Sequence, residues 1–191
     1  MPLTLTAPIS EDDYKNFPSL KLPDDFTGDK MTALLNKAWA FLTNIAQQPL
    51  SQTTATDVHE FGGRYCNVRP DGSLIILPKN TPLISVTSVS YSLSPANFGW
   101  TALTVFDAFG SRVILTSSPF YRGNSGFVQL VYSCGYAIVP DDLKLACALT
   151  AAHLISGGYF PTEGGGGEGS VLPLWLPRDV QEIVNDYKRV R

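Results

Sequence analysis

Three patterns in the sequence contain residue types that could do chemistry. Ser125 lies in Gly-Asn-Ser-Gly at residues 123–126, and His153 ends Thr-Ala-Ala-His at residues 150–153. A serine and a histidine within hydrogen-bond reach can act as nucleophile and general base in acyl transfer. The glycine spacing from Gly164 to Gly169 formally fits a dinucleotide-binding fingerprint. The paired acids at residues 24–25 and 141–142 could in principle serve as general acid and base.

The context of each pattern argues against that chemistry. In chymotrypsin-like proteases the histidine segment precedes the serine, whereas here it follows, and His153 falls where the apolar spacing predicts a helix. The glycine pattern has no strand before it and no helix directly after it, so we interpret it as a linker. Helix capping or turn formation explains the acidic pairs. Labelling of Ser125 by a serine-reactive probe would favour a hydrolase, but we predict no catalytic site.

The sequence also predicts neither a metal site nor a cofactor. It contains only two histidines, His59 and His153, and three cysteines, Cys66, Cys134 and Cys147, which lie far apart. Structural zinc sites need closely spaced ligands, and a disulfide framework needs paired cysteines. Free thiols are typical of a reducing, cytosol-like compartment.

Composition indicates a soluble protein that binds neither nucleic acid nor membranes. Charged residues make up 16% of the 191 residues, against about 25% in typical soluble domains, and the net charge is −3. Such a molecule has no overall attraction for phosphate backbones or anionic lipids. Residues 1–13 lack the basic start of a signal peptide, and the long uncharged stretches are too polar to span a bilayer.

The first half of the chain predicts an arm, a helix and then strands. Four prolines favour an extended arm over residues 1–28 with at most one short turn. Apolar residues at helical spacing predict a helix over residues 29–47. Short β-branched and aromatic runs follow, with a hairpin turn predicted at residues 107–110. The predicted strands are residues 54–61, 74–77, 83–93, 102–106, 112–116 and 127–133.

The chain then returns to helix. Pro140 and the two acids after it predict a helix start, and glycines at residues 157–158 end that helix. We expect a Gly-rich loop at residues 159–175 and a last helix with a basic tail at residues 176–191. The fold class is α+β: a small helical bundle of N-terminal, middle and C-terminal helices with an inserted antiparallel β-sheet or small barrel. Residues 29–158 are expected to form a single core domain.

Four segments follow one another along the chain: the helix end at residues 45–50, the strand region at 77–91, the strand that passes through Gly-Tyr into a Pro-initiated helix at 128–147, and the closing helix with its basic tail at 176–191. In this order they resemble the head-to-tail connector, or neck adaptor, proteins of tailed bacteriophages. The match covers roughly residues 29–191, and the Pro-rich arm replaces the acidic, alanine-rich helix with which such proteins usually begin.

The resemblance implies a structural virion protein that is not an enzyme. It implies a homo-oligomeric ring of about twelve copies under the portal protein, located in the neck and assembled in the host cytoplasm. The ring would extend the channel through which genomic DNA passes without specific binding, and would provide the docking platform for the next neck or tail-completion protein. No membrane partner is implied.

The resemblance also assigns a portal anchor to the carboxyl end, at Val184, Tyr187, Lys188, Arg189 and Arg191. Alternatively, the last helix folds back on residues 143–155 and the cations only cap it. A different class also remains open, a β-rich binding or adhesion module of a phage tail that uses Phe98, Trp100 or Tyr121 to hold carbohydrate.

Overall fold

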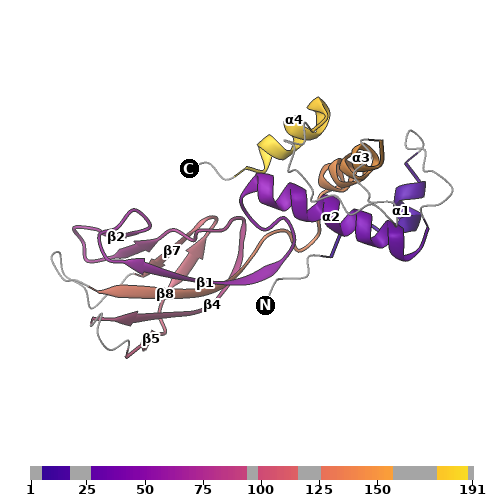
Figure 1. Cartoon of the computed structure of the whole chain (residues 1–191). Coiled ribbons are helices and arrows are strands. Elements are labelled where there is room, and N and C mark those ends of the chain that lie inside the picture. Colours follow the sequence, from indigo (N-terminus) through magenta and orange to yellow (C-terminus); the bar gives the residue numbers. More distant parts are fainter. Residues whose placement is uncertain (1–5, 18–26, 94–98, 116–125, 157–175, 189–191) are drawn as a thin grey trace, which may run out of the picture. The chain divides into compact units, whose positions relative to one another are not determined.

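The computed structural model describes residues 6–17, 27–93, 99–115, 126–156 and 176–188. Its strands and helices fall into two compact units. Residues 1–47 and 139–191 form one unit, in which all the helices lie, and residues 48–138 form the other, in which all the strands lie (Figure 1). The fold is therefore α+β with an inserted β region, as the sequence predicts.

The helical unit is built on α2 (Asp29–Ala46), which packs against α3 (Asp141–Ser156) and α4 (Arg178–Asp186). Seven residues on α2 are buried at helical spacing, so one stripe of the helix faces the core. They are Met31, Leu34, Leu35, Ala38, Trp39, Leu42 and Ala46. Four alanine or cysteine side chains on α3 are fully buried, and such small residues allow neighbouring helices to approach closely. The predicted helix at residues 29–47 is thus confirmed.

The N-terminal segment contains the short helix α1 (Glu11–Lys15). Ser10 and Asp13 form a reciprocal capping box that satisfies backbone donors at the start of α1. Glu11 accepts a hydrogen bond of 2.7 Å from the backbone N–H of Gly28, at the start of α2. Tyr14 is completely buried, and Asn36 of α2 accepts a bond from the backbone N–H of Ala7. The described part of the arm is therefore tied to α2.

The β unit consists of two four-stranded antiparallel sheets. One has the order β1 (Thr53–Glu60), β8 (Phe127–Cys134), β4 (Leu83–Ser92), β5 (Thr101–Leu103). The other has the order β2 (Cys66–Val68), β3 (Leu74–Ile76), β7 (Arg112–Leu115), β6 (Asp107–Phe109). Buried side chains from both sheets form one hydrophobic cluster, so the sheets pack face to face.

The prediction from the sequence placed one hairpin turn wrongly and did not include two strands, β2 and β6. The turn predicted at residues 107–110 is wrong in extent, because residues 107–109 form β6 and the hairpin closes over Gly110 and the residue after it. The strand before it, β5, pairs with β4 in the other sheet and not with β7. Strands of three residues carry too little periodicity to be recognised, and their partners are chosen by contacts distant in sequence.

Gly135 ends β8 in a conformation that requires glycine. Its φ is +89°, and a Cβ atom there would overlap the backbone carbonyl of Ser51. Gly110 also has a positive φ, +55°, but a Cβ there would meet nothing within 4 Å. A substitution at either glycine would therefore strain the backbone, whereas only a substitution at Gly135 would also cause a steric clash.

We predict that Gly135→Asn destabilises the protein by about 3 kcal/mol or more, because strain and clash add. Gly110→Asn is the matched control and should cost less than about 1 kcal/mol, since asparagine tolerates the left-handed region. Urea unfolding followed by circular dichroism measures both. Equal losses for the two variants would show that the contact with Ser51 is unimportant.

Candidate functional site

The structure describes only one of the two residues of the hydrolase pattern. His153 lies on α3, as predicted, and is half-buried, whereas Ser125 lies outside the described residues. The glycine pattern at residues 164–169 also lies outside them. Among the residues that the structure describes, no group of three or more histidine, cysteine or acidic side chains could hold a metal ion.

A buried polar cluster in the β unit was not singled out from the sequence. Tyr132 of β8 donates a hydrogen bond of 2.8 Å to Oδ2 of Asp57, and the backbone N–H of Lys79 donates one of 2.7 Å to the same oxygen. The Tyr132 hydroxyl in turn accepts a 3.0 Å bond from the backbone N–H of Asn80. The cluster therefore ties β1, β8 and the segment after β3 together.

His59 completes the cluster on β1, two residues after Asp57. Both side chains are about nineteen-twentieths buried, at 4% and 5% exposure. Nε2 of His59 lies 3.6 Å from Oδ2 of Asp57, which is longer than a hydrogen bond. This nitrogen has no hydrogen-bond partner in the described part of the chain. The signal in the sequence was Asp57 and His59 at strand spacing, which places both on one face.

The electrostatics of the cluster favour a fixed carboxylate. Burial alone would raise the pKa of Asp57, but the neighbouring His59 and the bonds from Lys79 and Tyr132 outweigh it and lower that pKa. Burial, together with the bond to Asp57, raises the pKa of Tyr132. Asp57 thus stays ionised and acts as a hydrogen-bond acceptor. We assign the cluster a structural role, since its hydrogen bonds cross-link three segments.

The three cysteines are buried and free. Burial raises the pKa of Cys66 and of Cys147 to about 12, and that of Cys134 to about 11. A thiol reacts as its thiolate, which is scarce at neutral pH when the pKa is this high. The cysteines therefore serve as packing residues.

The carboxyl end of the described chain is the second candidate site. Val180 and Val184 of α4 are completely buried in the helical unit, where α4 packs against α3. The helix itself therefore folds back as the alternative interpretation expected. Val184 is completely buried by this packing and therefore does not lie at the surface.

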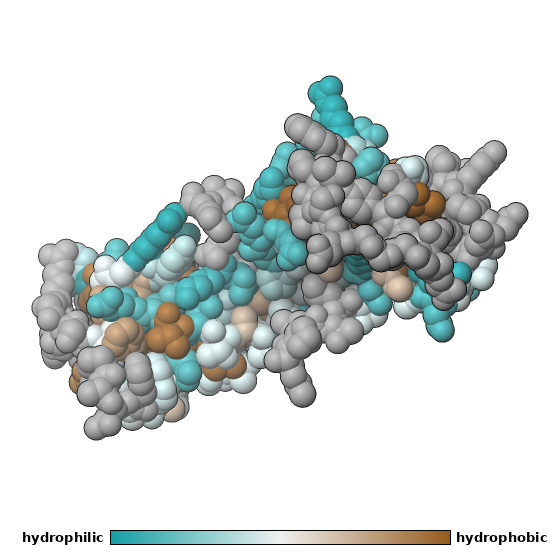
Figure 2. All heavy atoms as spheres, in the orientation of Figure 1, coloured by the Kyte–Doolittle hydropathy of each residue, from teal (hydrophilic) through white to brown (hydrophobic). Residues whose placement is uncertain are grey.

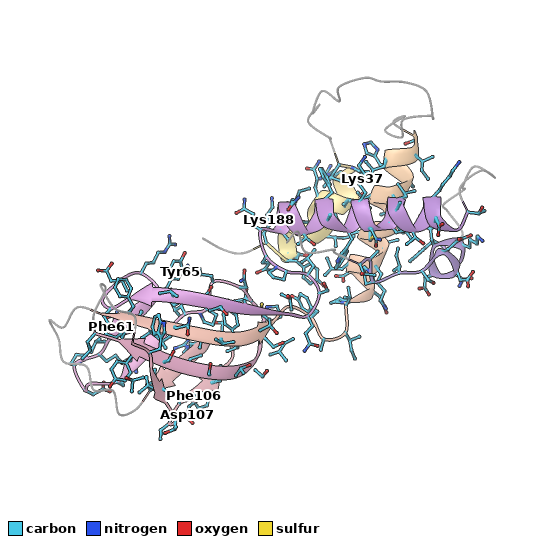
Figure 3. The ribbon with its side chains drawn as sticks, turned by 60° about the horizontal axis from the view of Figure 1, so that its bottom comes forward. Lys37, Phe61, Tyr65, Phe106, Asp107 and Lys188 are labelled. Carbon is cyan, nitrogen blue, oxygen red and sulfur yellow. The ribbon has the colours of Figure 1, made fainter. Side chains whose placement is uncertain are left out.

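Tyr187 fixes the point at which the tail leaves the helical unit. Its hydroxyl lies 2.8 Å and 2.7 Å from the two carboxylate oxygens of Asp142, at the start of α3, and donates to that carboxylate. Lys188 follows directly and is exposed (Figure 3). Arg189 and Arg191 lie outside the described residues. The structure thus brings Tyr187 to the base of α3 and leaves Lys188 facing solvent.

The aromatic residues considered for carbohydrate binding are only partly described. Trp100 is half-buried in the β unit, while Phe98 and Tyr121 lie outside the described residues. Trp39 is completely buried in the helical unit. Figure 2 shows hydrophobic residues at the surface over the strands. Among the described residues of the β unit, the large hydrophobic side chains with the greatest exposure are Ile138, Val105, Phe109 and Leu93.

None of the helices in the described ranges has the length and apolar character needed to cross a bilayer.

Similarity to known proteins identifies the family. The sequence matches the family model described as head completion protein over residues 7–190. The fold matches a chain in the neck of an empty gene transfer agent particle, solved with C6 symmetry, with a TM-score of 0.55 and 16% identity. A chain in the virion of the native gene transfer agent particle matches with a TM-score of 0.55 and 14% identity. Each match covers 94% of this chain and 89% of the other.

Curated proteins gave no match. The two structural matches are below the identity at which function can be compared, so they establish a shared fold. The family match extends over almost the whole chain, including α1, both sheets and the start of the tail. It agrees with the resemblance to phage connectors found in the sequence. The chain belongs to the head completion protein family.

Proposed function

We propose that this chain is the head-to-tail connector of a tailed phage, forming a ring beneath the portal. The observation that supports this most strongly is the family match over residues 7–190, together with the fold of a protein from a particle neck. That neck was solved with C6 symmetry. A ring of about twelve copies is compatible with sixfold symmetry, because twelve is a multiple of six.

The ring would prolong the channel for DNA and provide a platform for the next neck or tail-completion protein. A conduit must let DNA slide, so its wall should not bind phosphate groups strongly. The net charge of −3 fits this requirement. Assembly in the host cytoplasm fits the three free cysteines, since thiols stay reduced there.

The tail from Lys188 to Arg191 is proposed to dock the ring onto the portal. The packing of α4 and the bond from Tyr187 to Asp142 hold the start of the tail on the helical unit. Lys188, Arg189 and Arg191 then supply three cations for portal carboxylates or carbonyl oxygens. In this arrangement Val184 and Tyr187 hold the start of the tail on the helical unit, and the three cations contact the portal protein.

The ring is tested by mixing the purified chain with the portal protein. We expect a monomer or a mixture of small oligomers without portal, and a complex that contains one full ring with portal, because docking raises the local concentration of subunits. Light scattering gives the mass of each species. One or two copies per portal would contradict the ring, and stabilisation of the isolated chain by carbohydrate would instead favour an adhesion module.

A further inference from the structure

In the part of the β unit that the structure describes, strands with an unpaired edge lie on two opposite sides. In the described sheets, β1 and β2 each pair on one side only, and so do β5 and β6. Residues 61–65 join β1 to β2, and residues 104–106 join β5 to β6. We call the strands β1 and β2 with residues 61–65 the β1–β2 edge. We call the strands β5 and β6 with residues 104–106 the β5–β6 edge. Figure 3 shows Tyr65 on the side of β1, and Phe106 and Asp107 on the other side of the unit.

The β5–β6 edge is apolar and carries one acid. Val105 and Phe109 are 61% and 60% exposed, among the largest values for hydrophobic side chains in the described chain. Asp107 is the only charged residue between residues 99 and 110, and it forms no ion pair within the described residues. Exposed apolar side chains on open edge strands indicate a surface that another chain covers.

The β1–β2 edge carries a preorganised cation. The guanidinium of Arg64 lies 5.6 Å from the centre of the Tyr65 ring, which in turn lies 5.6 Å from the ring of His59. The buried His59 ring lies against the half-buried Tyr65 ring, and the side chain of Arg64 is exposed at the surface. Arg69 adds a second exposed cation at the end of β2, and Val58 of β1 is 40% exposed.

Each edge also carries a residue of the opposite charge. Arg112 of β7 stands opposite Phe109 in the β6–β7 register and is exposed. Glu60 ends β1 and is exposed as well. The two edges can therefore form two ion pairs, Asp107 with Arg64 and Arg112 with Glu60, around the apolar side chains of Val105 and Phe109.

We propose that the β5–β6 edge of one copy docks against the β1–β2 edge of the next copy in the ring. A cyclic ring requires two different, complementary surfaces on opposite sides of each subunit. These two edges meet that requirement within one chain, with Asp107 of one copy facing Arg64 of its neighbour. An unrelated partner would need only one of them. The inference rests on the proposed ring and names the surfaces that close it.

Reversal of charge at Asp107 and Arg64 tests the contact. In mixtures with portal, Asp107→Arg and Arg64→Asp should each raise the concentration for half-assembly of the ring by at least about tenfold, since like charges then face each other. The variant with both reversals should assemble close to the wild-type concentration. Lys30→Asp, an exposed reversal on α2, is the matched control and should assemble normally.

A crosslink identifies the neighbours directly. A chain with both Asp107→Cys and Arg64→Cys, treated on portal with a short bismaleimide, should give a ladder of covalent oligomers up to the full ring. Either single variant should give none, because the natural thiols are buried. A full ring without rescue and without a ladder would overturn the edge contact and leave the proposed function standing. Absence of any ring in the wild type would overturn both.

Discussion

Removal of residues 188–191 is expected to abolish docking to the portal while leaving the fold intact. α4 ends at Asp186, and Tyr187 makes the bond to Asp142. This truncation therefore removes the three cations and, of the described contacts at the end of the helix, only the backbone hydrogen bond from Lys188 to Asn185. Multiple charge-assisted contacts at the end of the chain should account for most of the docking energy. Co-sedimentation with portal-containing heads measures docking, and circular dichroism checks the fold.

Two further variants separate charge from length. The chain with Lys188, Arg189 and Arg191 all changed to Gln keeps its length and should also fail to dock. Arg178→Gln is the control: it removes an exposed cation from α4, the helix before the tail, where Arg178 pairs with Glu182. This variant should dock normally. Docking of the truncated chain at wild-type affinity would refute the anchor. Loss of helical signal on truncation would mean that the tail stabilises the helical unit.

Replacement of Asp57 should cause a large loss of stability in the β unit. Asp57→Ala leaves the Lys79 N–H and the Tyr132 hydroxyl without their acceptor, the first in a part-buried and the second in a buried hydrogen bond. Each unsatisfied buried donor costs about 1 to 3 kcal/mol, so we expect a loss of about 2 to 5 kcal/mol in the free energy of unfolding. Glu60→Gln, an exposed change on the same strand, should cost less than about 0.5 kcal/mol.

The loss should depend on pH with a defined sign. The pKa of Asp57 is lowered in the folded protein, so its ionised form stabilises the fold above the pKa of the unfolded chain. That contribution is lost as the pH falls through the folded pKa. The difference between wild type and Asp57→Asn should therefore be largest above about pH 4 and shrink in more acidic solution.

Urea unfolding at several pH values, followed by circular dichroism, measures this difference. The difference in the free energy of unfolding between wild type and Asp57→Asn could instead stay constant well below about pH 4. That result would show that the charge of the carboxylate does not contribute to stability. A loss below about 1 kcal/mol for Asp57→Ala would show that water or a rearranged backbone satisfies the donors.

Local sequence patterns were sufficient for the long elements. The apolar stripe of α2 repeats with the period of a helix, and α3 begins directly after Pro140. The alternation in β1 and β8 follows the period of a strand. The predicted range of β1 differs from the observed one by one residue at each end, and that of β8 by one residue at its last position. These elements bury one face over eight or more residues, so the pattern is strong enough to be recognised without a structure.

Short elements and polar contacts could not be read in the same way. The strands β2 and β6 have three residues each, and β5 pairs with β4 because of contacts across the sheet. The hydrogen bonds between Tyr132 and Asp57, and between Tyr187 and Asp142, join residues 75 and 45 positions apart. Nothing in a local pattern specifies such partners.

The sequence by itself determined the α+β class, the order of the long helices and strands, and the resemblance to phage connectors, because these depend on residue periodicity and on the order of short motifs. Only the tertiary structure decided that the β region is two packed sheets with open edges on opposite sides, that Asp57 is a buried acceptor, and that Val184 faces the helical core. The physical reason is that a side chain's environment is set by the segments folded around it, which the chain brings together from distant positions.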